Sequence, residues 1–464
     1  MKIIILGAGQ VGSTVARSLA DENNEVTVVD TDPVMLRRLE DAADLRTVHG
    51  EASHPSVLRD AGAEDADMIV AATSSDETNI VANQIAYTLF RTPVKIARIR
   101  SVQYTRETDL FNNDNIPIDM IISPEQEVTE YIQRIIEHPG AAQVVDFAKG
   151  QVRMVGVEVT DDAPMVKQPL AHLPELLGRI DTRVMAIYRG DDIIRPDGDS
   201  IIEDGDVVYF MGERKHVSRV IDVFHHKMHK NNHVMIAGGG NIGLLVARAL
   251  ERFHSVKVIE SQEERAQFIA SKLRSAMVFH GDVANQELLI RENIQEMDVF
   301  CALTNDDEAN ILSAMLAKSM GAKMIMSLIN RPAYVDLVER DIIDVAVSPQ
   351  QITIGRLLTS IRRGDVVAVH SLRRGVAEAL EGVVHGDADT SRLVGRSIGE
   401  LPLPDCANIG VVARPEADDS EKLKVLVAHN DLVIEPKDHL IVFVTDKQRI
   451  GEVEDLFQVG VTFI

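Results

Sequence analysis

The chain has 464 residues, which is too long for one hydrophobic core and suggests about three or four domains. Its formal net charge of −24 argues against non-specific binding to DNA, RNA or anionic lipid, because an acidic surface repels polyanions. Two cysteines, Cys301 and Cys406, are too few for a disulfide framework and favour a reducing cytosol.

The chain opens with an apolar, strand-like run that leads into a glycine-rich loop. The loop reads G-x-G-x-x-G and consists of Gly7, Ala8, Gly9, Gln10, Val11 and Gly12. In a dinucleotide-binding unit the first glycine permits a tight turn and the second lets a pyrophosphate approach the backbone. The third lets the following helix pack closely, and the amides at its N-terminus face the phosphates. The alternative is a strand–turn–helix whose glycines serve packing alone.

An acidic residue follows at the spacing that this motif requires. Residues 25–29 read as a second strand and end in Asp30, which lies 18 positions after Gly12. A carboxylate at this place accepts hydrogen bonds from ribose hydroxyls and repels a 2′-phosphate, which favours NAD(H) over NADP(H). Residues 66–73 form another buried strand, and its end at Thr73 and Ser74 is expected to border the ligand crevice.

A different kind of sequence follows this first lobe. Residues 124–137 read as a connecting helix entered through Ser-Pro, since proline suits a first helical position. Apolar runs then recur between Pro- and Gly-containing turns, at residues 153–159, 183–188 and 206–210, which predicts short β-strands. A histidine-rich segment at 225–233 ends the unit. Because no carboxylate or cysteine completes a chelating pattern there, we interpret it as a polar linker and expect no metal site.

The second half of the chain repeats the first. A second loop consists of Gly238, Gly239, Gly240, Asn241, Ile242 and Gly243, and an offset of 231 residues links Gly7 to Gly238 and Thr73 to Thr304. Residues 255–259 end in Glu260, 17 positions after Gly243. A helix at 349–362 and β-like runs at 409–412, 432–438 and 439–444 complete the copy. This period is too long for a solenoid and indicates duplication of a whole unit.

The predicted fold class is α/β with two tandem units. Each unit has a Rossmann-like, doubly wound parallel sheet lobe followed by a smaller β-rich α+β lobe. We place the four lobes at residues 1–123, 143–227, 232–348 and 368–453.

This order of lobes resembles the family of peripheral NAD-binding subunits of bacterial Trk potassium-uptake systems, which are built from two regulator-of-K⁺-conductance (RCK) units. The likeness covers nearly the entire chain. It implies a regulatory subunit that binds NAD(H), and in some members ATP or ADP, and gates potassium transport through an integral membrane potassium-translocating subunit. RCK units usually form rings of eight, so two per chain imply a homotetramer.

The resemblance also implies the residues of two binding sites. In the first site the loop residues Gly7 to Gly12 would hold the pyrophosphate and Asp30 the ribose, with contributions from Glu51, Thr73, Ser74, Arg98 and Arg100. The second site would use Gly238 to Gly243, Glu260, Asp282, Thr304 and Asn305. The alternative for the two arginines is an ordinary surface position. They align with Leu328 and Asn330, so we expect the two sites to differ in affinity or ligand.

Two other functions compete with regulation. An NAD-dependent dehydrogenase needs an acid or base beside the nicotinamide, and no such constellation is visible, so we expect no catalytic residues. A redox-sensing transcription regulator needs a basic nucleic-acid element, which this acidic sequence does not offer. Met1-Lys2 leads straight into the first strand and no apolar window reaches the roughly 20 residues that span a bilayer. We therefore expect a cytoplasmic protein attached to the inner membrane face through its partner.

Overall fold

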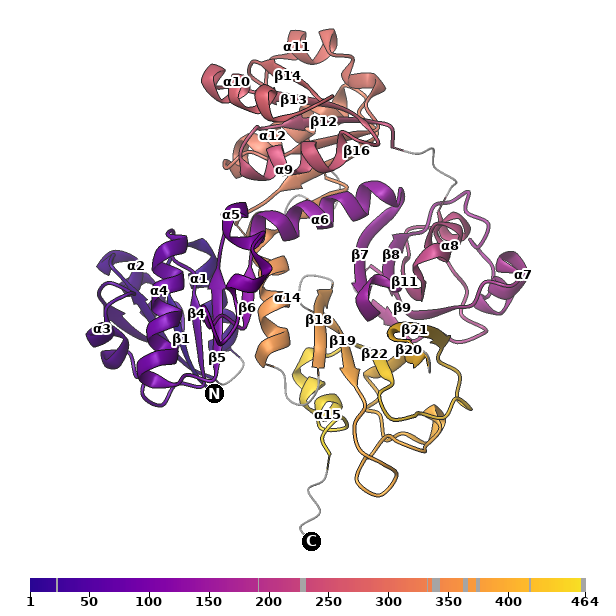
Figure 1. The fold of residues 1–464 in the computed structure, drawn as a ribbon. Helices are drawn as coiled ribbons and strands as arrows, with labels where there is room; N and C mark the ends of the chain where they lie inside the picture. The colour runs from indigo at the N-terminus through magenta and orange to yellow at the C-terminus, as the bar shows by residue number, and fades with distance from the viewer. Residues whose placement is uncertain are drawn as a thin grey trace. The chain divides into compact units, whose positions relative to one another are not determined.

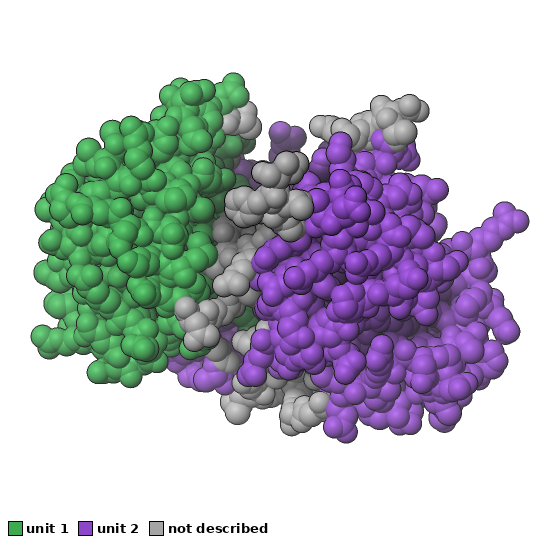
Figure 2. Space-filling model, turned by 90° about the horizontal axis from the view of Figure 1, so that it is seen from below, with its two compact units in different colours: residues 1–127, 349–360 green, residues 128–348, 361–464 purple. Residues whose placement is uncertain are grey.

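The computed structural model describes the chain apart from residues 22–23, 191, 226–230, 332, 336–342, 362–365, 373–375, 417–418 and 460–464. Most of the histidine-rich linker lies outside the described residues. The chain divides into two compact units, which Figure 2 colours separately. The first unit comprises Met1–Glu127 with Pro349–Ser360, and the second comprises Val128–Ser348 with Ile361–Ile464.

The first lobe is a six-stranded parallel sheet with helices between its strands (Figure 1). The strands are β1 (Lys2–Leu6), β2 (Glu25–Asp30), β3 (Arg46–His49), β4 (Met68–Ala71), β5 (Val94–Arg98) and β6 (Met120–Ile122). The helices are α1 (Gln10–Ala20), α2 (Pro33–Glu40), α3 (Pro55–Asp60), α4 (Asp76–Ile85) and α5 (Val102–Thr105). The strand order is β3-β2-β1-β4-β5-β6. The chain adds β2 and β3 on one side of β1 and β4 to β6 on the other, and ligands of such sheets bind beside this reversal point between β1 and β4.

The second parallel lobe repeats this arrangement. Its strands are β12 (His233–Ala237), β13 (Ser255–Glu260), β14 (Met277–His280), β15 (Val299–Ala302), β16 (Met324–Leu328) and β17 (Val345–Val347). Its helices are α9 (Asn241–Leu250), α10 (Glu263–Lys272), α11 (Gln286–Arg291) and α12 (Asp307–Ser319). The order β14-β13-β12-β15-β16-β17 matches the first sheet strand for strand. The predicted duplication of a doubly wound lobe is therefore confirmed.

The central strands form because their sequences are almost continuously apolar. Ile3, Ile4 and Ile5 of β1 are all buried, as are Val70 of β4 and Ile236 of β12. Parallel strands covered by helices on both faces bury successive side chains, so they read as apolar runs without alternation.

Each parallel lobe is followed by a five-stranded antiparallel sheet. The first has β7 (Ala141–Phe147), β8 (Val152–Glu158), β9 (Thr182–Arg189), β10 (Asp192–Ile194) and β11 (Val207–Glu213), with α7 (Leu173–Leu177) and α8 (Val217–Phe224). The second has β18 (Val366–Leu372), β19 (Ala377–Val383), β20 (Ala407–Glu416), β21 (Asp419–Val427) and β22 (His439–Val444), with α15 (Ile450–Glu454). Their orders are β10-β9-β11-β8-β7 and β18-β19-β22-β20-β21.

The prediction of a β-strand at residues 432–438 is wrong. This segment makes only an isolated bridge, between Val433 and Ser397, and otherwise forms turns. The cause is Arg414 of β20, which donates to the carbonyl of Val433 and to both carboxylate oxygens of Asp438. These bonds hold the segment as a loop across the end of the sheet.

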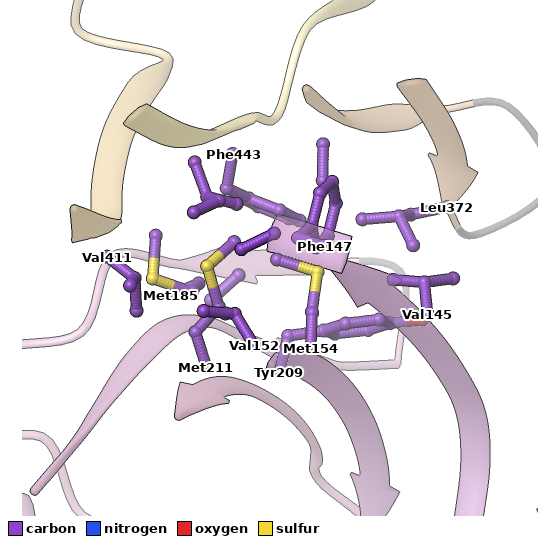
Figure 3. Close-up of a cluster of buried hydrophobic side chains, with 14 of the residues drawn as sticks. Val145, Phe147, Val152, Met154, Met185, Tyr209, Met211, Leu372, Val411 and Phe443 are labelled. Atoms are coloured by element: carbon purple, nitrogen blue, oxygen red, sulfur yellow. The ribbon is translucent and has the colours of Figure 1, made fainter. Parts of the chain in front are cut away.

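The two antiparallel sheets share one hydrophobic core (Figure 3). The first sheet contributes Phe147, Met154 and Tyr209, and the second contributes Val411 and Phe443. The rings of Tyr209 and Phe443 lie 6.1 Å apart between centroids. Because aromatic and aliphatic side chains from both sheets fill the same space, the two β-rich lobes of the chain stabilise each other.

The two connecting helices, α6 (Pro124–Glu137) and α14 (Pro349–Ile361), occur where the sequence predicts them. Residues 349–360 of α14 belong to the first unit, and Arg356 lies 3.4 Å from Glu127 of α6. The compact units thus divide the chain differently from the four expected lobes, whose boundaries remain a proposal. Among the described residues no helix combines the length and apolar character needed to cross a bilayer.

Candidate nucleotide-binding sites

A cavity of about 390 Å³ lies beside the reversal point of the first sheet. Nine of the predicted residues line it: Gly7, Gly9, Gln10, Val11, Asp30, Glu51, Thr73, Ser74 and Arg98. The predicted residues Ala8, Gly12 and Arg100 are not part of its lining. The structure therefore gathers most of the first predicted site around one cavity.

The three loop glycines differ in what surrounds them. Gly7 has a φ of +104°, and a Cβ there would lie 2.9 Å from the carbonyl oxygen of Ala72. A Cβ on Gly12 would lie 1.8 Å from the carbonyl oxygen of Gly7, so the helix begins directly against the loop. A Cβ on Gly9 would meet no protein atom within 4 Å. Gly9 thus borders open space, which is what close approach of a pyrophosphate requires.

Asp30 is held at the tip of β2 by two backbone amides. Its Oδ2 accepts from the amide of Ala8 at 2.5 Å, and its Oδ1 accepts from the amide of Asp32 at 2.8 Å. Each carboxylate oxygen can accept a further hydrogen bond. The carboxylate is therefore oriented beside the glycine loop, with acceptor capacity left for ribose hydroxyls.

A buried asparagine connects the ends of two strands at the cavity. Asn79 Oδ1 accepts from the amide of Thr73 at 3.0 Å and from its hydroxyl at 2.7 Å, while Asn79 Nδ2 donates to the carbonyl of Arg98 at 2.8 Å. Asn310 makes the same three bonds with Thr304 and Leu328. Asn79 and Asn310 are separated by the same 231 positions as the two threonines, and in each unit the pair of threonine and asparagine fixes the strand ends that border the cavity.

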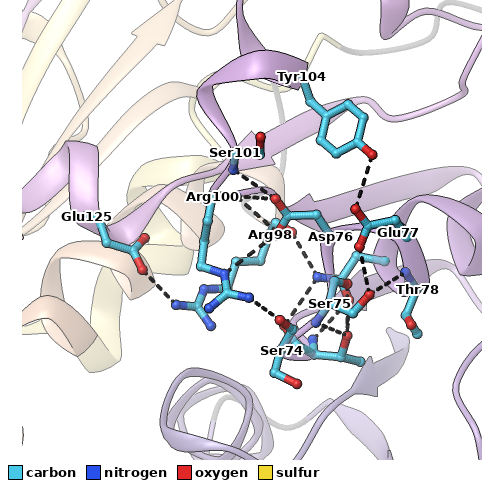
Figure 4. A network of polar contacts seen from close by, with 12 residues as sticks. Ser74, Ser75, Asp76, Glu77, Thr78, Arg98, Arg100, Ser101, Tyr104 and Glu125 are labelled. Atoms are coloured by element: carbon cyan, nitrogen blue, oxygen red, sulfur yellow. Dashed lines mark hydrogen bonds and ion pairs between the residues drawn. The ribbon is translucent and has the colours of Figure 1, made fainter. Parts of the chain in front are cut away.

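Arg98 and Arg100 have different roles (Figure 4). Arg98 lines the cavity, donates to Glu125 Oε1 at 3.0 Å, and has a buried Nε without a hydrogen-bond partner in the structure. Arg100 donates to the carbonyl of Ser74, and its Nε lies 3.7 Å from Asp76. Arg98 therefore borders the cavity, whereas Arg100 is bonded to Ser74 of its wall, and a ligand contact by Arg98 stays a prediction. A direct ligand contact by Arg100 stays a prediction.

The second sheet has an equivalent cavity of about 430 Å³. The predicted residues Gly238, Gly240, Glu260, Asp282, Thr304 and Asn305 line it, and Gly239, Asn241, Ile242 and Gly243 do not. Gly238 has a φ of +103°, and a Cβ on Gly243 would lie 2.0 Å from the carbonyl oxygen of Gly238. A Cβ on Gly240 would meet nothing within 4 Å. The loop geometry of the first site is repeated.

The second acid is one methylene longer, and the loop is adapted to it. Glu260 accepts from the amide of Gly239 at 2.7 Å and from that of Gln262 at 2.9 Å. A Cβ on Gly239 would lie 3.0 Å from Glu260 Oε2 and 2.0 Å from Ile269 Cδ1. An alanine at this place, as at Ala8 of the first loop, would require the end of the Ile269 side chain to move, so the two loops differ in the space beside the acid.

Sequence reasoning missed several residues that line the cavities. They are Thr31, Met35, Ser75 and Thr78 in the first, and Ser261, Gln262, Arg265, Asp306 and Ala309 in the second. They come from the start of the helix after the second strand and the start of the helix after the fourth strand. The offset of 230 residues between the two acids also pairs Met35 with Arg265, so these two residues occupy equivalent positions in the two units.

A larger cavity of about 850 Å³ lies elsewhere in the second unit and carries no glycine loop. Arg153 in its lining is already bonded to Asp146 and His138. Burial, with the charge of Arg153, lowers the pKa of His138 to about 4. Cys301 is fully buried in β15, and burial raises the pKa of its thiol to about 12. Among the described residues no cluster of His, Cys, Asp or Glu could hold a metal ion.

Comparison with known proteins identifies relatives along the whole chain. Residues 3–124 and 234–349 match the TrkA-N domain, and residues 154–225 match the TrkA-C domain. The Trk system potassium uptake protein TrkA of Halomonas elongata is 52% identical over 463 residues, and that of Vibrio alginolyticus is 51% identical over 465 residues. Both alignments cover 100% of each chain.

Solved structures resemble the fold at low sequence identity. The GsuK channel bound to NAD matches with a TM-score of 0.62 and 16% identity, covering 98% of this chain and 78% of that one. The GsuK RCK domain matches with a TM-score of 0.61 and 17% identity, covering 98% and 94%. These likenesses show that the fold of tandem parallel and antiparallel lobes is shared.

Proposed function

The chain belongs to the TrkA family of Trk-system potassium uptake proteins, and on this premise we propose that it senses nucleotides and thereby gates potassium transport. Its place in potassium uptake follows from that membership, and it is a regulatory subunit, not an oxidoreductase. The finer proposal is that NAD(H), or ATP or ADP, occupies the two cavities. Their occupancy would control an integral membrane potassium-translocating partner.

One observation carries the nucleotide proposal. In both parallel lobes the second glycine of the loop faces open space, and a carboxylate held by backbone amides lies beside it. This is the arrangement needed to admit a pyrophosphate and bind the neighbouring ribose. A solved structure of the same fold, the GsuK channel, was obtained bound to NAD, which supports NAD(H) as one ligand here.

The proposed mechanism is mechanical coupling. A nucleotide shifts the equilibrium between two arrangements of the subunit by no more than its difference in affinity for them. Typical couplings of about 1–3 kcal/mol correspond to changes of roughly 5- to 150-fold. Two cavities per chain in a homotetramer attached to the inner membrane face through its partner would give a steep response.

Calorimetric titration with NADH, NAD⁺, ATP and ADP tests nucleotide binding. Gly9→Asp and Gly240→Asp each place a carboxylate where the pyrophosphate would approach, in a position where a Cβ meets no protein atom. We expect wild type to bind at two sites, each variant at one, and the double variant at none. Unchanged thermal midpoints control for folding. Absence of binding by wild type for all four compounds would overturn the proposal.

The partner proposal needs a separate experiment. The full chain should co-purify with a potassium-translocating membrane subunit of a Trk system when both are expressed together. Membranes containing an unrelated transporter serve as the control. Equal recovery from both membranes would contradict the proposed partnership.

A further inference from the structure

The two cavities carry their positive charge at opposite ends. The first is lined by one arginine, Arg98, which comes from the end of β5. Its counterpart in the second unit is Leu328, a buried apolar residue at the end of β16. The second cavity is instead lined by Arg265, from the first turn of α10, where the first cavity has Met35. Among the described residues each cavity therefore has a single lining arginine, at different places.

Arg265 lies next to the acid expected to bind ribose. Its Nε donates to the carbonyl oxygen of Gly239 at 2.7 Å, while the amide of Gly239 donates to Glu260. The guanidinium also lies 5.0 Å from the ring centroid of Phe268. A nucleotide whose ribose is held by Glu260 must place its adenosine half beside Arg265. A planar guanidinium there can stack on an adenine ring and attract phosphate charge.

The other half of the second cavity is less favourable for a nucleotide. Asp306 is the N-cap of α12, where α4 of the first unit has Ser75, and each side chain accepts a hydrogen bond from a backbone amide of its helix. Its carboxylate joins Glu260 and Asp282 in the lining, and no arginine of the described part of the chain lines the cavity at that end. A ligand extending past the pyrophosphate would therefore meet added negative charge without the cation that Arg98 supplies in the first cavity.

We propose that Arg265 makes the second cavity select an adenine mononucleotide with a phosphate chain, of the ADP class, over a nicotinamide dinucleotide. The first cavity, with Arg98 and Met35, selects the dinucleotide. This inference rests on the proposed nucleotide-sensing function and adds that the two cavities of one chain read different ligands.

Single-site proteins test the selectivity. Gly9→Asp leaves the second cavity and Gly240→Asp leaves the first, so calorimetry with ADP and NADH reads each alone. We expect the Gly9→Asp protein to bind ADP more tightly than NADH, and the Gly240→Asp protein to show the reverse order. Tighter binding of NADH by the Gly9→Asp protein would overturn the inference.

Reciprocal substitutions test the role of Arg265. In the Gly9→Asp protein, Arg265→Met should weaken ADP binding about tenfold, as expected for loss of one stacked, charged contact. Methionine occupies the equivalent position of the first unit, so this variant should fold. In the Gly240→Asp protein, Met35→Arg should strengthen ADP binding. Unchanged ADP affinity in both variants would overturn the inference.

The outcomes separate this inference from the proposed function. If neither single-site protein nor wild type binds any nucleotide, the proposed function fails. If the Gly240→Asp protein binds NADH but the Gly9→Asp protein binds nothing, the function stands on the first cavity and the selectivity inference is overturned. Arg265→Lys keeps the charge without the planar group and should give an intermediate ADP affinity.

Discussion

At the residue scale, the two glycine loops combine positions that the fold requires with positions that only a ligand requires. Gly12 and Gly243 lie so close to the carbonyl oxygens of Gly7 and Gly238 that no side chain fits. Gly9 and Gly240 are unconstrained by the protein. The folded chain alone gives no reason for a glycine at these two places, which is why they point to a bound group.

This difference predicts opposite effects on stability. Gly12→Ala should lower the thermal midpoint, since its Cβ would lie 1.8 Å from a backbone oxygen and overpacking typically costs about 1–3 kcal/mol. Gly9→Ala should leave the midpoint nearly unchanged. Differential scanning calorimetry of the two variants checks both. Equal midpoints would show that the loop is not packed as described.

The two arginines of the first cavity give a second matched pair. In the Gly240→Asp protein, Arg98→Leu, which copies the second unit, should weaken NADH binding about tenfold because a charged ligand contact is lost. Arg100→Asn, which also copies the second unit, should change NADH affinity little because Arg100 is bonded to the carbonyl of Ser74. Titration of both variants distinguishes the roles. A greater loss of NADH affinity from Arg100→Asn than from Arg98→Leu would contradict these roles.

At the scale of elements, each antiparallel sheet is tied to its neighbouring loop by one ion pair between a partly exposed arginine and a buried aspartate. Arg189 donates to both oxygens of Asp206, and Arg414 does the same with Asp438. Both aspartates have no exposed surface. The sequence shows the repeated turns, but it does not show that arginines from β9 and β20 hold them.

Removing the arginine should strongly destabilise the β-rich lobe. Arg189→Met removes two hydrogen bonds from the buried Asp206 carboxylate, which keeps that of the Glu203 amide. Because Arg189 is 37% exposed, the cost should lie near about 3 kcal/mol, the lower end for breaking a buried pair. Glu203→Gln removes the half-exposed acid on the same arginine and should cost no more than about 1 kcal/mol. Urea unfolding of both variants measures the difference. Similar costs would mean that the buried pair contributes little.

The shared core of the two antiparallel sheets also predicts a pH dependence. Burial lowers the pKa of His370 from 6.5 to about 4, and burial with the charge of Arg153 does the same for His138. His370 Nε2 bonds to the carbonyl of Asp146 at 3.1 Å. Between these pH values the unfolded chain binds more protons than the folded one, so stability is full above about 6.5 and falls as the pH drops toward 4.

Urea unfolding midpoints measured from pH 7.5 to pH 4.5, in steps of roughly one pH unit, test whether stability falls at low pH as predicted. A His370→Gln variant keeps a hydrogen-bond donor but does not titrate. The urea midpoint of wild type should exceed that of this variant at pH 7.5, and this difference in midpoint should shrink as the pH falls. A difference that grows toward low pH would contradict burial of a neutral His370.

At the scale of the whole molecule, the sequence predicts the parallel lobes better than the antiparallel ones. Apolar runs, paired glycines and a constant offset determine the doubly wound sheets, and both sheets have the expected strand order. The sequence patterns do not predict the strands β7, β10, β18, β19 and β21. The rings of Tyr209 and Phe443 pack together across 234 positions of sequence, a pairing that local periodicity does not encode.

For the two candidate sites, too, the sequence predicts the local motif but not the contacts that the fold creates. The loop residues and the two acids follow from the motif, and the structure places most of them around the cavities. The motif does not predict Arg265, which lies five positions after Glu260 and returns to the loop through the first turn of α10, where its Nε donates to the carbonyl of Gly239. Its identity as a lining residue depends on that three-dimensional return.

Potassium flux tests the central claim most directly. The chain and its membrane partner would be reconstituted together in vesicles, and potassium uptake measured while NADH and ADP are titrated. We expect wild type to show nucleotide-dependent flux and the Gly9→Asp/Gly240→Asp double variant to show flux that no nucleotide alters. The same nucleotide response in the double variant would contradict the claim that occupancy of these two cavities controls transport.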